Sequence, residues 1–145
     1  MYTPNESDST RTWTMEDQET RAALEEHWSG SPADDLETAL DKADLIYHDD
    51  VVVEYPQSGE RILGRRNLRA LREAYPANVD FAIRRIHGGG DLWVTEYVIT
   101  YDGRPVHTVS IMEFEAGKVA RETLYFADPF EAPEWRAQWI ERMEP

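Results

Sequence analysis

Glu122 is the residue whose type and position most strongly suggest chemistry. Residues 118–127 alternate as a β-strand does, and successive side chains of a strand point to opposite faces, so Glu122 shares a face with Leu124 and Phe126. A carboxyl group on an apolar face must be paired, protonated or functional. The pattern therefore indicates a general acid or base. The alternative is a salt bridge to an arginine at the wall of a pocket.

Hydroxyl and aromatic residues on other predicted strands fall on the same face as Glu122. Tyr97 comes from the strand 92–101, and Tyr55 ends the strand 51–55. Phenol groups beside a carboxyl group can donate hydrogen bonds to an oxygen on which negative charge develops. We therefore predict Glu122, Tyr55 and Tyr97 as catalytic residues. The predicted substrate-binding residues are Trp28, Trp93, Thr108, Ser110, Met112, Leu124 and Phe126.

This mixture of aromatic walls and a few convergent polar groups is typical of a small-molecule cavity. The expected partner is therefore an apolar small-molecule ligand. Each serine or threonine on this face has an alternative interpretation, which is a packed core in which its hydroxyl group is satisfied.

Other kinds of site are disfavoured by the residues present. The chain has no cysteine, which excludes disulfides, thiolate catalysis and sulfur-ligated metals. The four histidines fall on different elements without metal-ligand spacing, so neither a metal site nor a cofactor is predicted. Gly88-Gly89-Gly90 precedes a strand rather than opening a helix, which favours a hairpin turn over a phosphate loop. His48, at the junction of a predicted helix and strand, is the second titratable candidate.

Five arginines form a basic cluster within and just before a predicted helix. We expect them to pair with the acidic helices that precede them. The alternative function is to guide an anionic ligand to the mouth of the pocket. The cluster consists of Arg61, Arg65, Arg66, Arg69 and Arg72.

The remaining elements follow from the spacing of apolar residues and from turn signals. Residues 1–13 are polar and aperiodic and predict a disordered N-terminal arm, residues 14–130 form one domain, and the tail 131–145 carries Trp135 and Trp139 at the spacing of a short amphipathic helix on the rim. The predicted helices span 14–28, 31–50 and 64–75, with Tyr47 on the buried stripe of the second. The predicted strands span 51–55, 79–87, 92–101, 105–114 and 118–127, and residues 57–63 read as a loop.

The opposite face of the predicted meander is not plainly polar. An antiparallel sheet with one solvated face shows clean alternation of apolar and polar residues, but here both faces carry apolar residues. We therefore expect helices to cover one face and a second copy of the chain to cover the other, which predicts a homodimer. The dimer surface consists of Val94, Val98, Val109 and Ile111.

Composition and charge limit the classes of partner. The formal net charge of −14 argues against nucleic acid, whose phosphates would be repelled. No apolar run approaches the roughly 20 residues that a membrane helix needs, and no secretory signal opens the chain. We expect an acidic cytoplasmic protein with no membrane partner.

Residues 15–130 resemble the SnoaL-like group of the nuclear transport factor 2-like superfamily. The resemblance rests on Tyr47-His48-Asp49-Asp50-Val51 before the first strand, on Gly64 opening a helix, and on Phe114-Glu115-Ala116-Gly117-Lys118-Val119 leading to Tyr125-Phe126-Ala127-Asp128. It implies an α+β fold, a cone-shaped barrel in which a strongly curved mixed β-sheet wraps around N-terminal helices and encloses a pocket. Members are often dimers, and they include polyketide cyclases, ketosteroid isomerase, limonene epoxide hydrolase and proteins that only bind.

The catalytic residues of those enzymes do not carry over to this chain. The general base of ketosteroid isomerase falls at Tyr55, and its second acid falls near Ser110. The arginine and two aspartates of the epoxide hydrolases fall at Tyr97, Ile99 and Leu124. Two functions are therefore expected as alternatives: acid/base isomerase, cyclase or hydratase chemistry, and non-catalytic binding of a ligand or of a partner.

Overall fold

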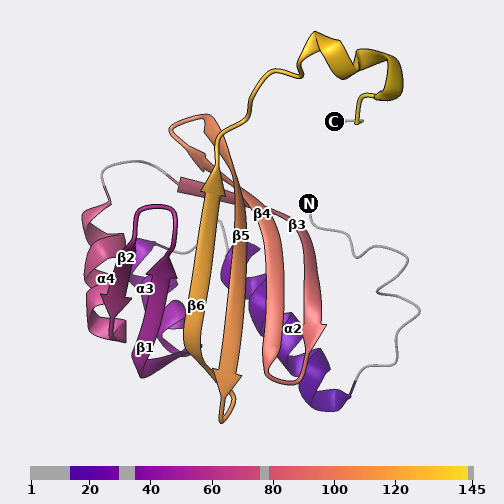
Figure 1. Ribbon diagram of the computed structural model, residues 1–145. Coiled ribbons are helices and arrows are strands. Elements are labelled where there is room, and N and C mark those ends of the chain that lie inside the picture. Colours follow the sequence, from indigo (N-terminus) through magenta and orange to yellow (C-terminus); the bar gives the residue numbers. More distant parts are fainter. Residues whose placement is uncertain (1–13, 30–34, 76–78, 144–145) are drawn as a thin grey trace.

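The computed structural model describes residues 14–29, 35–75 and 79–143 (Figure 1). The predicted arm 1–13 and the first four residues of the helix predicted over 31–50 lie outside these residues. Among the described residues no helix is long and apolar enough to cross a membrane.

A six-stranded mixed sheet forms the body of the domain. Its strands are β1 Tyr47–Tyr55, β2 Glu60–Leu63, β3 Val79–Gly89, β4 Leu92–Tyr101, β5 Arg104–Glu115 and β6 Lys118–Ala127. Their order in the sheet is β2-β1-β6-β5-β4-β3, and only β1 and β6 run parallel. The sheet curves around helices on one side, which confirms the predicted α+β fold (Figure 1). It is not closed, because the edge strands β2 and β3 do not pair with each other.

Helix α2, Met15–Ser29, covers the β3 end of the concave face. Thr14 caps its N-terminus by accepting a hydrogen bond from the backbone of Asp17 at 3.0 Å, and Glu16 and Asp17 suit the positive end of the helix dipole. Its buried side chains, Leu24 and Trp28, face the sheet. The Arg21 guanidinium also donates to the carbonyl of Ile86 at 2.8 Å, so apolar packing and a polar tie together fix the helix in place.

Helices α3, Leu36–Asp44, and α4, Arg65–Ala74, cover the β1–β2 end. Asp35 caps α3 by accepting from the backbone of Thr38 at 2.8 Å. Gly64 precedes α4 with φ 90°, a conformation that favours glycine, and its N–H donates to Val51 at 2.8 Å. This bond ties the start of α4 to strand β1.

Two segments differ from the sequence predictions. The helix predicted as far as Asp50 ends at Asp44, and Tyr47 opens strand β1 instead, because its backbone pairs with Val119 of β6. The loop predicted over 57–63 contains strand β2, which forms a hairpin with β1 through a turn in which Gly59 has φ 75°. The first strand is therefore longer than its Val51-Val52-Val53 run indicates.

A bulge in β6 changes which side chains point inward at one end of the sheet. Phe114 pairs with Val119, whereas Glu113 pairs with Arg121, so Ala120 is an extra residue on β6. Val119 is consequently buried in the core. Strict alternation along the strand would place it on the outer face, opposite Glu122. From Arg121 onward the alternation holds, and Glu122 and Leu124 point inward.

The predicted dimer surface and the tail are both partly exposed. Val94, Val98, Val109 and Ile111 are half-buried on the outer face. The tail contains a short 3-10 helix, η1 Glu134–Trp139, which lies away from the sheet in Figure 1. Its tryptophans are 73% and 71% exposed and do not pack on the rim as expected.

Candidate active site around Glu122

Glu122 lies at the centre of the concave face and is completely buried. Its neighbours across the sheet are Val53 on β1 and Met112 on β5. The Tyr47 hydroxyl donates to Oε1 at 2.7 Å, and the Ser110 hydroxyl donates to Oε2 at 2.5 Å. Each carboxyl oxygen therefore has one donor, supplied by one of the two strands that flank β6.

Arg72 extends this network from helix α4. One of its guanidinium nitrogens donates to the Tyr47 hydroxyl at 3.2 Å, and its guanidinium carbon lies 5.4 Å from the centre of the Tyr47 ring. The Tyr47 hydroxyl thus accepts from Arg72 and donates to Glu122. The salt bridge between Glu122 and an arginine, which was the alternative to a functional carboxyl group, is replaced by contact through a phenol.

Most of the other clustered arginines pair with acids, as the sequence predicts. Arg65 contacts Asp49 at 2.5 Å, and Arg61 contacts Glu54 at 3.4 Å. Arg69 contacts two aspartates of α3, Asp41 and Asp44, each at 2.7 Å. The pairs of Arg65 and Arg69 hold α4 against β1 and α3, whereas Arg72 contacts Tyr47.

Burial is the largest influence on the pKa of the Glu122 carboxyl group. Burial raises the pKa of its carboxyl group, and the Ser110 hydrogen bond, the charge of Arg72 and the Tyr47 hydrogen bond oppose this rise without cancelling it. The neutral acid is therefore more populated than for a glutamate in water. A raised pKa makes it easier for a carboxyl group to take up a proton and give it back during a reaction.

His27 of α2 closes the site from the helix side and is neutral. Its Nε2 lies 3.5 Å from the Tyr47 hydroxyl, and its ring packs edge-on against Trp28 with centroids 4.5 Å apart. Burial and the charge of Arg72 lower the pKa of His27 to about 3. His27 therefore cannot serve as a cationic acid near neutral pH.

Two phenol groups and an indole lie on the mouth side of the network. Trp28 stacks on Tyr97 with ring centroids 4.2 Å apart, and Tyr55 packs against Phe126 at 5.6 Å. Burial, followed by the charge of Glu122, raises the pKa of both Tyr55 and Tyr97. Both phenols therefore keep their protons and can act as hydrogen-bond donors.

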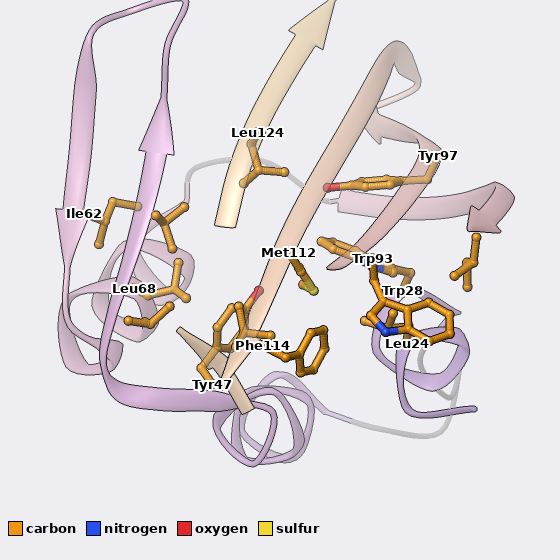
Figure 2. Close-up of a cluster of buried hydrophobic side chains, with 14 of the residues drawn as sticks. Leu24, Trp28, Tyr47, Ile62, Leu68, Trp93, Tyr97, Met112, Phe114 and Leu124 are labelled. Carbon is orange, nitrogen blue, oxygen red and sulfur yellow. The ribbon is translucent and has the colours of Figure 1, made fainter. Parts of the chain in front are cut away.

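The predicted site residues of the strands lie along the concave face, and Trp28 of α2 packs against this face through Tyr97. Tyr55 and Phe126 are half-buried, and the others are buried. Figure 2 shows side chains from the strands and from α2 pointing toward one another across this surface. Two of the polar groups donate hydrogen bonds to backbone carbonyls. The Thr108 hydroxyl donates to the carbonyl of Val106 at 3.2 Å, and the Trp93 indole N–H donates to the carbonyl of Gly90 at 3.1 Å. Their role is consistent with packing.

The mouth of the concave face carries a depression of about 230 Å³. Its walls come from α4, from the hairpin of β4 and β5 and from the end of β6. The lining residues are Tyr75, Tyr101, Arg104, Val106, Phe126 and Asp128. Burial and the neighbouring Tyr75 raise the pKa of Tyr101 to about 12, so this phenol also stays protonated. Phe126 is the predicted site residue that lines the depression, and neither Glu122 nor Arg72 lines it.

Three residues of the network were missed by the sequence analysis. The sequence pattern predicts Tyr47 on a helix, assigns no role in the site to His27, and places Arg72 in the basic cluster. One signal for Arg72 existed, because it stands four residues after buried Leu68 and three before Tyr75 and so shares their helix face. No local signal identified Tyr47 as a partner of Glu122, since the two are brought together by parallel pairing of distant strands.

The chain matches known proteins in both sequence and fold. Residues 33–122 match the family model described as a SnoaL-like domain. An NTF-2 like protein of unknown function from Burkholderia xenovorans LB400 is 53% identical, with a TM-score of 0.80 over 90% of this chain and 100% of that one. No curated protein matches.

Two solved structures with enzyme names share the fold at lower identity. A putative ketosteroid isomerase from Kribbella flavida DSM 17836 is 24% identical, with a TM-score of 0.75 over 88% of this chain and 92% of that one. An LEH-like epoxide hydrolase from M. tuberculosis is 23% identical, with a TM-score of 0.57 over 75% of this chain and 83% of that one. At these identities the similarity shows the fold alone.

Proposed function

The chain belongs to the SnoaL-like domain family, and from this premise we propose that it moves a proton on a small, largely apolar molecule bound at its concave face. Glu122 carries the proton. Tyr55 and Tyr97 donate hydrogen bonds to the oxygen on which charge develops. Isomerisation, cyclisation and hydration are the reaction classes that this set of groups can support.

The observation that carries this proposal is the state of Glu122. It is completely buried, its pKa is raised, and its two oxygens accept from hydroxyl groups rather than from a cation. A purely structural buried carboxylate is usually paired directly with a charge. A hydroxyl-bonded carboxyl group with a raised pKa instead suits general acid/base catalysis.

The second candidate function is non-catalytic binding of a ligand at the mouth. It is favoured by the depression beside Phe126 and Tyr101, which does not extend to Glu122. In this alternative the Tyr47–Glu122–Ser110 network only stabilises the sheet, and the ligand contacts the aromatic rim.

Replacement of Glu122 by glutamine separates the two functions. A panel of small ketones and unsaturated carbonyl compounds is incubated with the protein in D2O, and deuterium incorporation next to the carbonyl group is followed by NMR. If Glu122 transfers protons, Glu122→Gln should reduce the exchange rate by about 10²- to 10⁴-fold. The control is Glu113→Gln, an exposed glutamate on β5, which should exchange at the wild-type rate.

Carbon-13 NMR titration of the glutamate carboxyl groups gives the complementary result. We expect the Glu122 resonance to titrate above the range near 4.3 that is usual for glutamate. A Glu122 that titrates in the ordinary range, together with no exchange on any compound of the panel, would contradict the acid/base function and leave the binding function.

We also propose that the outer face of the sheet is covered by a second copy of the chain. Besides the half-buried Val94, Val98, Val109 and Ile111, this face has a depression of about 180 Å³ beside His107 and Tyr125. Sedimentation velocity at micromolar concentration should give a dimer for the wild type and a monomer for Val109→Glu, because a charge on an apolar contact surface is costly to bury. Arg66→Glu on α4 is the control and should remain dimeric. A monomeric wild type would refute the proposal.

A further inference from the structure

We propose that the concave site binds an anionic oxygen group of its ligand, a carboxylate or an equivalent oxyanion, on the guanidinium group of Arg72. This inference rests on the proposed function, since it names the class of ligand that the same site would take. It concerns binding, so it can be tested without knowledge of the reaction.

The first observation is that Arg72 lacks an acidic partner. Arg65 and Arg69 on the same helix each contact aspartates at 2.5 to 2.7 Å. In the part of the chain that the structure describes, the contacts of Arg72 are a hydrogen bond to the Tyr47 hydroxyl and its position over the Tyr47 ring. A guanidinium group has five N–H donors in a fork that matches a carboxylate, and one bond to a phenol leaves donors free.

The second observation is the direction in which Arg72 points. It is half-buried and reaches from α4 into the concave face rather than into solvent. Its charge acts on titratable groups from four other elements of the fold: α2, β1, β4 and β6. These groups are His27, Tyr47, Tyr55, Tyr97 and Glu122. The guanidinium group therefore contacts Tyr47 and is close enough to the other four groups for its charge to act on them.

The third observation is a set of hydrogen-bond donors in or against the core cluster that contains Tyr47, the partner of Arg72. The indole N–H of Trp28 is buried and has no hydrogen-bond partner in the described structure, although the side chain is only 3% exposed. Tyr55 and Tyr97 keep their phenol protons. Glu122, the buried carboxyl group of the site, already receives two hydrogen bonds. A buried donor without an acceptor is complementary to a ligand with anionic or carbonyl oxygens.

Binding of an anion at Arg72 has a consequence for Glu122. The charge of Arg72 now favours the ionised form of Glu122. A bound anion offsets that charge and adds a like charge nearby, so it raises the pKa of Glu122 and favours proton uptake. Ligand affinity should therefore fall as the pH rises through the pKa of free Glu122. His27, whose pKa is about 3, stays neutral when the pH is well above that value.

The test compares carboxylates with their neutral amides. Benzoate, phenylacetate and cinnamate are titrated by calorimetry against the full chain, and benzamide, phenylacetamide and cinnamamide serve as matched neutral probes. We expect the carboxylates to bind about tenfold or more tightly than the amides, because a hydrogen bond to a charged group is stronger than one between neutral groups. Titration in two buffers of different ionisation enthalpy should reveal proton uptake with the carboxylates only.

Two variants assign the effect to Arg72. Arg72→Gln should weaken carboxylate binding by about tenfold or more and weaken amide binding less, so the preference for carboxylates should be lost. Arg66→Gln is the matched control, since it removes the same charge from an exposed position on the same helix, and it should bind as the wild type does. Arg72→Lys keeps the charge without the fork and should give an intermediate affinity.

Several outcomes would overturn the inference. They are the absence of binding by all three carboxylates, equal binding of carboxylates and amides, and wild-type carboxylate affinity in Arg72→Gln. The comparison of probes on the wild type decides the question even if Arg72→Gln fails to fold. Failure of the acid/base function is distinguishable, because Glu122→Gln should still bind carboxylates while it loses both proton uptake and deuterium exchange.

Discussion

Glu122→Ala is expected to lower the free energy of unfolding by about 2 to 5 kcal/mol. The substitution leaves the Tyr47 and Ser110 hydroxyls without their acceptor in a buried place, and each unsatisfied group costs about 1 to 3 kcal/mol. It also opens a cavity between Val53 and Met112. Urea unfolding followed by circular dichroism measures the loss. Glu113→Ala, at an exposed site, should change stability by less than about 0.5 kcal/mol.

The pH dependence of the free energy of unfolding tests separately whether the pKa of Glu122 is raised. The pKa of Glu122 is raised in the folded protein, so the folded state holds a proton that the unfolded chain releases near pH 4.3. Between the unfolded and folded pKa values the folded state therefore binds more protons. The stability contribution of Glu122 is fully present below that window and falls by up to about 1.4 kcal/mol per pH unit as the pH rises through it.

Glu122→Gln should remove this slope, because glutamine does not titrate. It also keeps the size of the side chain and one acceptor oxygen, so its loss of stability should be smaller than that of Glu122→Ala. The measurement is the free energy of unfolding of the wild type and of Glu122→Gln at pH values from 4.5 to 8. Parallel curves for the two proteins would contradict the raised pKa and the role derived from it.

The inward face of the central strands follows from the sequence because its pattern is local. Glu122, Leu124 and Phe126 alternate with Arg121, Thr123 and Tyr125, and the tight Asp102-Gly103 turn sets the neighbouring strand in register. Strand alternation and hairpin pairing involve residues close in the chain. They therefore predict the face on which the carboxyl group lies.

The partners of that carboxyl group depend on distant contacts, which the sequence pattern does not encode. Tyr47 reaches Glu122 only because β1 pairs in parallel with a strand 75 positions later in the chain. Val119 turns inward only because of the bulge at Ala120. Both features arise where one element meets another, so periodicity within a single element cannot reveal them.

The same distinction explains why the chemistry is harder to predict than the fold. A glutamate on an apolar face is visible in the sequence, but its pKa depends on burial, on two hydroxyls and on Arg72. Arg72 follows Arg69 by three residues, which is less than one helical turn of about 3.6 residues. It therefore points in a different direction, toward Tyr47 instead of toward Asp41 and Asp44. Arg69 thus joins α4 to α3, whereas Arg72 contacts a residue of the site, and the sequence pattern does not distinguish the two.

Trp28→Ala should have the largest effect on stability among substitutions in α2, about 3 to 5 kcal/mol. Trp28 and Leu24 are the buried side chains of this helix, and Trp28 stacks on Tyr97 and packs against Phe81 at 5.8 Å. Its loss leaves a cavity and frees Tyr97 to change its position. Trp135→Ala, at a site 73% exposed in the tail, is the matched control for monomer stability and should be close to neutral.

Trp28→Phe tests the unpartnered indole by itself. The substitution keeps most of the stacking surface and removes a buried N–H that has no acceptor in the described structure. Because an unsatisfied buried donor costs about 1 to 3 kcal/mol, its removal should offset much of the lost packing, and the net loss should stay below about 1.5 kcal/mol. A loss as large as that of Trp28→Ala would mean that the indole already has an acceptor. In the expected case, carboxylate affinity should also fall in Trp28→Phe, since the indole N–H without a partner among the described residues is then available to the ligand.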